Sequence, residues 1–141
     1  GIVLQLHVIG MFLPSLITGD LIKKFGHKKM IYAGIVIMLT TIITHFTFET
    51  YFGFMVGLIF LGIGWNFLFV SGTSLLVVSY NKEDKFLAQG LNDFVVFSSQ
   101  SIGALSAGII LFSTSWKTLN LICLPFLFLL LLFSLINNKK K

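Results

Sequence analysis

The stretch from Ser15 to Lys29 reads "SLITGDLIKKFGHKK", and it interrupts a chain that is otherwise strongly apolar. Its second half gathers the lysines Lys23, Lys24, Lys28 and Lys29. Gly19 precedes these lysines, and Gly26 stands between the two pairs. Lysines and glycines between two long apolar runs indicate a short polar connection between two membrane-spanning helices. We predict that the two glycines are the bends of this connection and that the lysines anchor it on one side of the membrane.

The overall composition identifies the class of protein. Apolar residues make up 56% of the 141 residues, charged residues only 11%, and the mean hydropathy is +0.97. A soluble domain carries about 25% charged residues, which it needs to cover a water-facing surface. We therefore expect an integral membrane protein in contact with the lipid bilayer. We expect no nucleic acid partner, because the basic residues flank apolar runs and form no basic domain.

Five apolar segments are long enough to cross a bilayer as helices, which takes about 20 residues. They cover residues 1–19, 30–48, 52–76, 86–112 and 118–136. The short breaks between them predict antiparallel neighbours. Every segment is longer than a transmembrane strand, so helices are expected to satisfy the backbone hydrogen bonds in lipid. The sequence therefore predicts an all-α polytopic bundle with five spans, forming a single partial transmembrane domain over residues 1–141.

The distribution of lysines predicts the orientation of the bundle. The first connection, the third connection and the tail together hold 9 of the 10 basic residues, and in a five-span bundle these places share one face. The third connection and the tail contribute Lys82, Lys85, Lys139, Lys140 and Lys141. Only Lys117 falls on the other face. Since positive residues accumulate in cytoplasmic loops, we expect a cytoplasmic C-terminus in the cell (inner or plasma) membrane.

The two ends of the sequence carry a further expectation. The chain begins "GIVLQLHVIG", without Met and already inside an apolar run, and it ends "NNKKK" directly after the last span. The beginning lacks the basic region and the cleavage site of a signal peptide. We expect a fragment of a longer protein, with missing N-terminal helices of the same protein as its partners.

Three polar residues, Gln89, Asn92 and Asp93, share one face near the start of the fourth span. Asp93 lies about seven residues inside the span, so about 10 Å along its axis. A carboxylate at this depth is costly in lipid, which makes these residues candidates for proton coupling or gating. The alternative is that the helix extends beyond the membrane, with Asp93 near the headgroups and hydrogen-bonded to Gln89 or Asn92.

Small residues continue this face toward the end of the fourth span. Gly103 and Ala107 are four residues apart, and so are Ala104 and Gly108. This spacing permits close contact between two membrane helices. We therefore expect Gly103, Ala107 and Gly108 to form a helix-packing seam.

The third and first spans supply candidates for binding a small-molecule substrate. Trp65, Asn66 and Phe69 share one face of the third span, which is rich in glycine. This face suits a solute path on a helix that bends, and it also fits a packing face with one satisfied Asn. His7 is the only histidine deep in a predicted span; it binds substrate, relays protons or merely packs. The fifth span is apolar nearly all round, so we expect it to face lipid with a kink at Pro125.

The sequence contains no pattern for catalysis or metal binding. Its single cysteine, Cys123, excludes an internal disulfide, and no Cys/His spacing of a metal site occurs. There is no Ser/His/Asp arrangement, no phosphate-binding glycine loop and no pair of intramembrane carboxylates. We therefore expect no enzyme activity, no cofactor and no metal.

The connection at residues 19–29 resembles a signature of the major facilitator superfamily, G-x-L-x-D-[RK]-x-G-[RK]-[RK], which joins two transmembrane helices on the cytoplasmic side. The matching residues are Gly19, Leu21, Lys24, Gly26 and Lys28. Lys23 stands at the acidic position, and Asp20 lies three places earlier. The acid of the family usually pairs with basic groups and helix ends to hold one conformation, so the chain departs from the pattern at that position.

Residues 62–108 resemble a bacterial subgroup of the same transporters, from the tenth helix into the eleventh. The resemblance implies a secondary transporter that moves a small solute by alternating access between two halves. It places this chain as helices eight to twelve, favoured by the ending after the last span, or as helices two to six. The third span then lines the central cavity, the first and fourth meet the other half, and the second and fifth face lipid. The competing hypothesis is a stand-alone five-helix scaffold that assembles through the seam.

Overall fold

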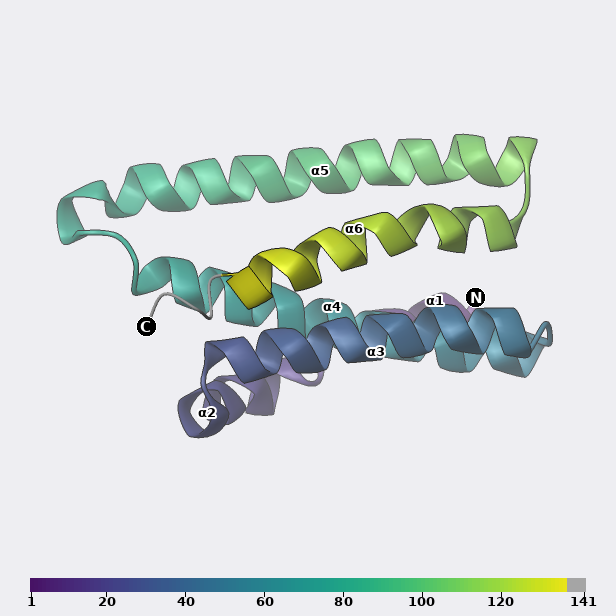
Figure 1. Cartoon of the computed structure of the whole chain (residues 1–141), viewed down its shortest axis with the longest axis horizontal. Coiled ribbons are helices and arrows are strands. Elements are labelled where there is room, and N and C mark those ends of the chain that lie inside the picture. Colours follow the sequence, from purple (N-terminus) through teal and green to yellow (C-terminus); the bar gives the residue numbers. More distant parts are fainter. Residues whose placement is uncertain (137–141) are drawn as a thin grey trace.

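The computed structural model describes residues 1–136, and that range is helical with no strand (Figure 1). The helices are α1 Ile2–Phe12, α2 Ser15–Phe25, α3 His27–Thr47, α4 Tyr51–Val77, the short 3₁₀ helix η1 Lys82–Asp84, α5 Lys85–Ser113 and α6 Trp116–Ile136. By length and composition, 5 helical stretches of the described range can cross a membrane, with α1 and α2 together forming the first. The prediction of an all-α bundle with five spans is confirmed.

The first crossing is broken in its middle. Pro14 has no backbone N–H and cannot continue the hydrogen bonds of α1. The last of these bonds runs from the N–H of Leu13 to the carbonyl of Ile9 at 2.8 Å, and α2 begins directly after Pro14. Leu13 and Pro14 stand halfway along the crossing from Ile2 to Phe25. The break therefore lies near the middle of this candidate crossing rather than at either end.

The connection between the first two crossings is a single residue. Gly26 alone separates α2 from α3, and its φ of 85° lies in the region that favours glycine. Gly19 lies inside α2, so the prediction that it forms the other bend is wrong. Lys23 and Lys24 occupy the last turn of α2. Positive charge there complements the C-terminal end of the helix dipole, which favours a helix that continues past Gly19.

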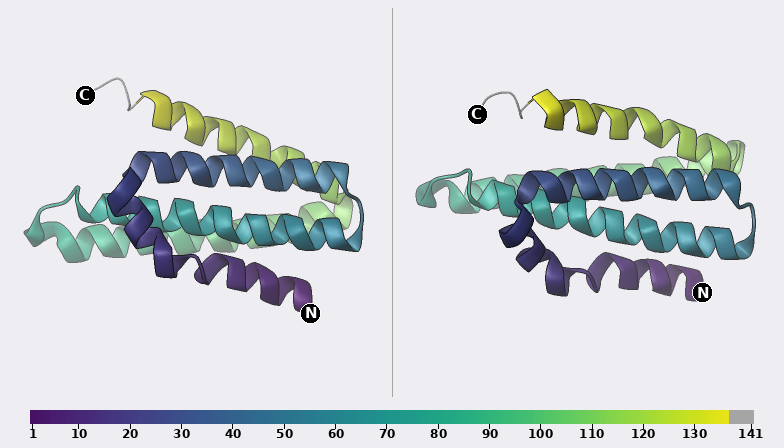
Figure 2. Two further views of the ribbon diagram at one scale, coloured as in Figure 1. Left: turned by 90° about the horizontal axis from the view of Figure 1, so that it is seen from below. Right: turned by 60° about the horizontal axis from the view of Figure 1, so that its bottom comes forward.

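Helix α4 is the centre of the packed part of the bundle, since it contacts α1 and α2 on one side and α3 on the other (Figure 2). Glycines allow both contacts. A Cβ atom on Gly62 would lie 2.5 Å from the backbone oxygen of His7, and one on Gly64 would lie 3.3 Å from that of Gly34. Small residues let helix backbones approach closely in membranes. These two glycines of the third span are thus packing positions within a continuous helix.

Helix α5 stands apart from this packed part and lies beside α6 (Figure 1). None of its residues is buried among the described residues. The predicted seam of Gly103, Ala107 and Gly108 meets no helix there, since a Cβ atom on either glycine would have no neighbour within 4 Å. Large apolar side chains such as Phe112, which is 97% exposed, also lie open. No helix within residues 1–136 packs against the seam, so its role in helix packing stays a prediction.

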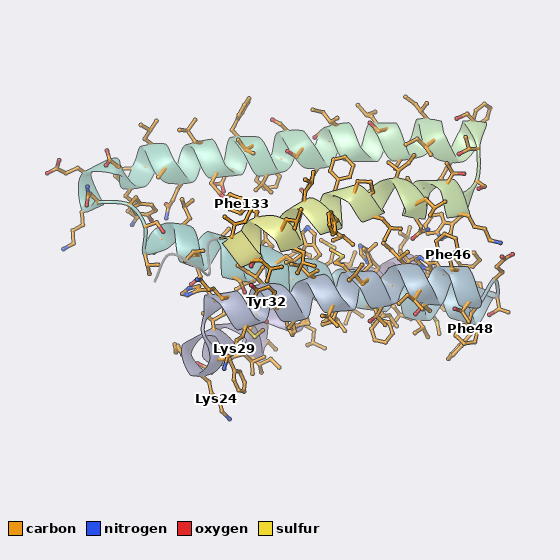
Figure 3. The ribbon with its side chains drawn as sticks, in the orientation of Figure 1. Lys24, Lys29, Tyr32, Phe46, Phe48 and Phe133 are labelled. Atoms are coloured by element: carbon orange, nitrogen blue, oxygen red, sulfur yellow. The ribbon has the colours of Figure 1, made fainter. Side chains whose placement is uncertain are left out.

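The charged connections separate to opposite ends of the bundle. The turn between α2 and α3 lies at the same end as η1, and the connections before α4 and α6 lie at the other (Figure 1). Lys24 and Lys29 mark the first end and Phe48 the second (Figure 3). At the second end Lys117 forms an ion pair with Glu49. The tail lysines at 139–141 lie outside the described residues, so the cytoplasmic C-terminus stays a prediction.

Candidate functional site

Asn66 of α4 lies against the break between α1 and α2 and hydrogen-bonds to both sides of it. Its Nδ2 donates to the carbonyl oxygen of Met11 at 2.7 Å and to Oγ of Ser15 at 2.6 Å. Its Oδ1 accepts a hydrogen bond of 2.7 Å from Oγ1 of Thr18. Asn66 is 1% exposed and Thr18 is 0% exposed. We call these four residues the Asn66 cluster; they hold the two halves of the first crossing against α4.

Pro14 explains why a polar side chain is needed at this place. In an uninterrupted helix the Met11 carbonyl accepts from the N–H four residues later. Leu13 and Pro14 keep helical dihedral angles, but the hydrogen bonds of the helix are interrupted at this point. The side chain of Asn66 supplies the missing donor. Thr18 Oγ1 also lies 2.7 Å from the carbonyl oxygen of Pro14, so its single proton serves either that oxygen or Asn66. The cluster thus satisfies backbone groups that a proline break exposes inside a membrane.

A row of aromatic rings lies beside the Asn66 cluster. Trp65 stacks on Phe69 with ring centroids 4.6 Å apart and an angle of 10° between the planes. Phe12 of α1 meets Trp65 edge-on at 6.5 Å. Trp65 and Phe69 are half-buried, and Phe12 is 61% exposed. The row therefore presents aromatic surface on an open side of the packed helices, and the three candidates Trp65, Asn66 and Phe69 lie together as predicted from their spacing.

His7 lies on the contact between α1 and α4, but apart from the Asn66 cluster. Its Nδ1 is 2.7 Å from the backbone oxygen of Leu58. Leu58 precedes Asn66 by eight residues, which is about 12 Å along a helix. This hydrogen bond gives His7 a packing role between two helices, and the structure does not bring it to the aromatic row.

The polar residues at the start of α5 form a separate group. Gln89 Nε2 donates to the hydroxyl of Tyr80 at 2.8 Å, and Asn92 Nδ2 donates to Asp93 Oδ1 at 3.2 Å. Asp93 is exposed. Within residues 1–136 this group makes no hydrogen bond to the Asn66 cluster, because α5 lies on another side of the bundle. The role of Asp93 in coupling or gating stays a prediction.

The basic connection is held by short contacts near the membrane surface. Asp20 pairs with Lys23 at 2.9 Å one turn along the same helix, and both side chains are about 80% exposed. Solvent screens such an exposed pair, so it adds little to stability. His27, which no sequence pattern singled out, places Nε2 2.9 Å from Oγ of Ser74 and so ties the start of α3 to α4. Lys23, which stands where the family signature has an acid, therefore pairs with Asp20 of its own helix.

A second buried polar pair joins α3 to α6. His45 Nδ1 lies 3.3 Å from Asn120 Oδ1, and the two residues are 3% and 8% exposed. The ring of Trp116 meets His45 edge-on at 5.3 Å. His45 stands near the end of its predicted span, and it is buried, whereas His7 is only half-buried. The sequence does show a polar residue in each of two apolar spans, His45 and Asn120. Periodicity within a single helix, however, cannot show that residues on two different helices are in contact.

The whole sequence, residues 1–141, matches the family model described as Major Facilitator Superfamily. The chain is 36% identical to the riboflavin transporter RfnT of Brucella anthropi, over 98% of this chain and 35% of that protein. It is 35% identical to the uncharacterized MFS-type transporter YdeG of Bacillus subtilis, over 86% of this chain and 29% of that protein. It is 29% identical to the uncharacterized MFS-type transporter YddS of the same organism, over 86% of this chain and 28% of that protein.

No solved structure matches the chain significantly. The chain spans about a third of the length of the curated relatives it matches. Because the family model covers the basic connection and all five crossings together, the resemblance noted in the sequence is confirmed: this chain belongs to the Major Facilitator Superfamily, a family of membrane transporters and not of enzymes.

Proposed function

We propose that this chain is part of a secondary active transporter that moves a small solute by alternating access. The observation that carries the proposal is the break at Pro14 in mid-crossing, held by Asn66. Secondary transporters form their solute sites near the bilayer midplane from interrupted helices, since irregular backbone offers polar groups there. The aromatic row of Phe12, Trp65 and Phe69 adjoins this break. The solute site lies on this side of α1 and α4.

The proposed solute is a small molecule with a flat aromatic ring system. Exposed aromatic faces bind such rings by stacking, and one aromatic pair contributes about 0.5–1.5 kcal/mol beyond the area it buries. The name of the relative RfnT, a riboflavin transporter, supports this class of solute. Asn66 already makes three hydrogen bonds within the protein, so its contribution to binding is to position Trp65 and the break.

We further propose that the open sides of α1 and α5 meet further helices of the same protein. The chain spans about a third of its relatives, and α5 has no buried residue in the described range. We also propose that the chain lies in the cell membrane with its C-terminus in the cytoplasm, which the distribution of lysines supports. A stand-alone scaffold is the second candidate, since the exposed seam at Gly103 would serve assembly equally well.

Uptake by vesicles that contain the full-length transporter tests this function. A panel of radiolabelled solutes, with riboflavin and a sugar among them, should give saturable, gradient-driven uptake of the flat aromatic member only. Trp65→Ala should raise its apparent KM several-fold, and Phe86→Ala, which changes a side chain 84% exposed on α5, should not. Saturable uptake of the sugar alone would refute the solute class, and no uptake of any panel member would refute transport. Residues 1–141 alone should not transport.

A further inference from the structure

A crevice between α3 and α6 lies outside the proposed solute site. It contains a cavity of about 360 Å³ whose walls come from α3 and α6, with Leu61 of α4. A second cavity of about 200 Å³ lies between the same two helices, and Leu127 lines both cavities. The two cavities therefore adjoin and form one crevice along α6. No residue of α1 or α2 in the described range lines it.

The crevice is polar at one end and apolar at the other. His45, Trp116 and Asn120 line its first end, whereas the second cavity has only aliphatic and phenyl side chains, ending at Leu131. His45 uses Nδ1 for Asn120, and its Nε2 is turned toward Gly57 of α4. Trp116 Nε1 is buried and has no hydrogen-bond partner in residues 1–136. An indole N–H in such a place normally finds an acceptor, and Trp116 is one of the residues that line this end of the crevice.

The dimensions of the crevice match half of a bilayer. Asn120 and Leu131 are eleven residues apart, which is about 16 Å along a helix, and the hydrocarbon core of a membrane is about 30 Å thick. The polar end lies at the end of the bundle where Lys117 and Glu49 pair. An exposed cation and an exposed anion side by side complement a zwitterionic headgroup. Tryptophan is also typical of the membrane–water interface, with its ring in the apolar part.

We propose that this crevice binds one acyl chain of a bilayer phospholipid. The chain lies between α3 and α6 past Leu127, and the ester carbonyl oxygen at its polar end accepts a hydrogen bond from Trp116 Nε1. The headgroup lies over the Lys117 and Glu49 pair. The site holds a lipid rather than the transported solute, and it needs neither the Asn66 cluster nor solute movement.

Photolabelling of the full-length transporter in phosphatidylcholine nanodiscs tests the site. The probe is a trace of phosphatidylcholine with a diazirine in one acyl chain, and labelled residues are found by mass spectrometry. Label should concentrate several-fold at Cys123 and Leu127, which line the crevice, over Leu129 and Phe133, which are 62% and 67% exposed on α6. Leu127→Trp should fill the crevice and abolish the excess, and the matched control Leu129→Trp should leave it unchanged.

Uniform label along α6, or an excess that survives Leu127→Trp, would overturn the proposal. Displacement of the label by riboflavin would also overturn it, because the crevice would then be a solute site. Trp116→Phe keeps an aromatic ring and removes only the N–H donor. Native mass spectrometry should show one phosphatidylcholine retained by the unaltered protein and several-fold less by this variant; equal retention would remove the Trp116 hydrogen bond and with it the proposed pose.

Discussion

The Nδ2 atom of Asn66 on α4 lies 2.7 Å from the carbonyl oxygen of Met11 on α1. This hydrogen bond joins the continuous helix at the centre of the bundle to the one crossing that proline interrupts. A further bond from the same Nδ2 reaches Ser15 on the far side of the break. One amide thus fixes how α1 and α2 are placed relative to each other and to α4.

Replacing Asn66 by Ala should loosen this break. The change removes three hydrogen bonds and leaves the Met11 carbonyl without its side-chain donor, whereas the Thr18 hydroxyl can still donate to the Pro14 carbonyl. We expect a loss of about 1–3 kcal/mol in the free energy of unfolding, measured as a lower thermal midpoint in detergent, together with weaker apparent affinity for the solute. Asn81→Ala, at an exposed position before η1, is the control and should change neither. An unaltered midpoint and affinity for Asn66→Ala would show that the Asn66 cluster does not hold α1 and α2 against α4.

Gly62→Ala should force α1 away from α4. The added Cβ atom would lie 2.5 Å from the His7 carbonyl oxygen and 2.9 Å from the carbonyl carbon of Gly10, which is backbone that cannot rotate away. Overpacking of this kind costs about 1–3 kcal/mol, seen as a lower thermal midpoint. Gly72→Ala meets no atom within 4 Å and should be neutral or stabilising by up to about 1 kcal/mol. Equal midpoints for the two variants would mean that the helices are not in backbone contact.

Asp93→Asn should abolish proton-driven uptake if Asp93 carries the coupling proton. The variant keeps the size and the hydrogen bond to Asn92 but can no longer bind and release a proton at its side chain. Uptake is measured in vesicles with an imposed proton gradient and compared across pH. Asp84→Asn, in the exposed helix η1, is the matched control and should retain full uptake. Wild-type rates with an unchanged pH dependence in Asp93→Asn would remove this residue from the mechanism.

The His45 and Asn120 pair should behave non-additively. Asn120→Leu leaves the buried Nδ1 of His45 without its partner, which we expect to cost about 1–3 kcal/mol. The double variant His45→Phe with Asn120→Leu should lose less than the sum of the single changes, since neither polar group is then buried alone. Thermal midpoints of the four proteins measure the coupling. Strictly additive losses would show that the two side chains do not depend on each other.

The class of protein, the five crossings and the family followed from patterns that are local along the chain. The length of an apolar run decides whether a helix can span a bilayer, and the position of lysines decides which connections stay on one side. Both are readable without knowing any contact. Even the clustering of Trp65, Asn66 and Phe69 follows from helix spacing alone. The break at Pro14 did not, because Pro125 also lacks an N–H and yet lies inside the continuous helix α6.

The partners of these residues depended on the tertiary structure. Asn66 and Met11 are 55 residues apart in sequence, and His45 and Asn120 are 75 apart. Which faces meet depends on how neighbouring helices cross and how closely their backbones approach, and Gly62 permits the close contact between α1 and α4. The same glycine pattern fits a flexible helix and a tightly packed one. Only the position of α1 against α4 distinguishes the two, because close packing is a property of both helices together.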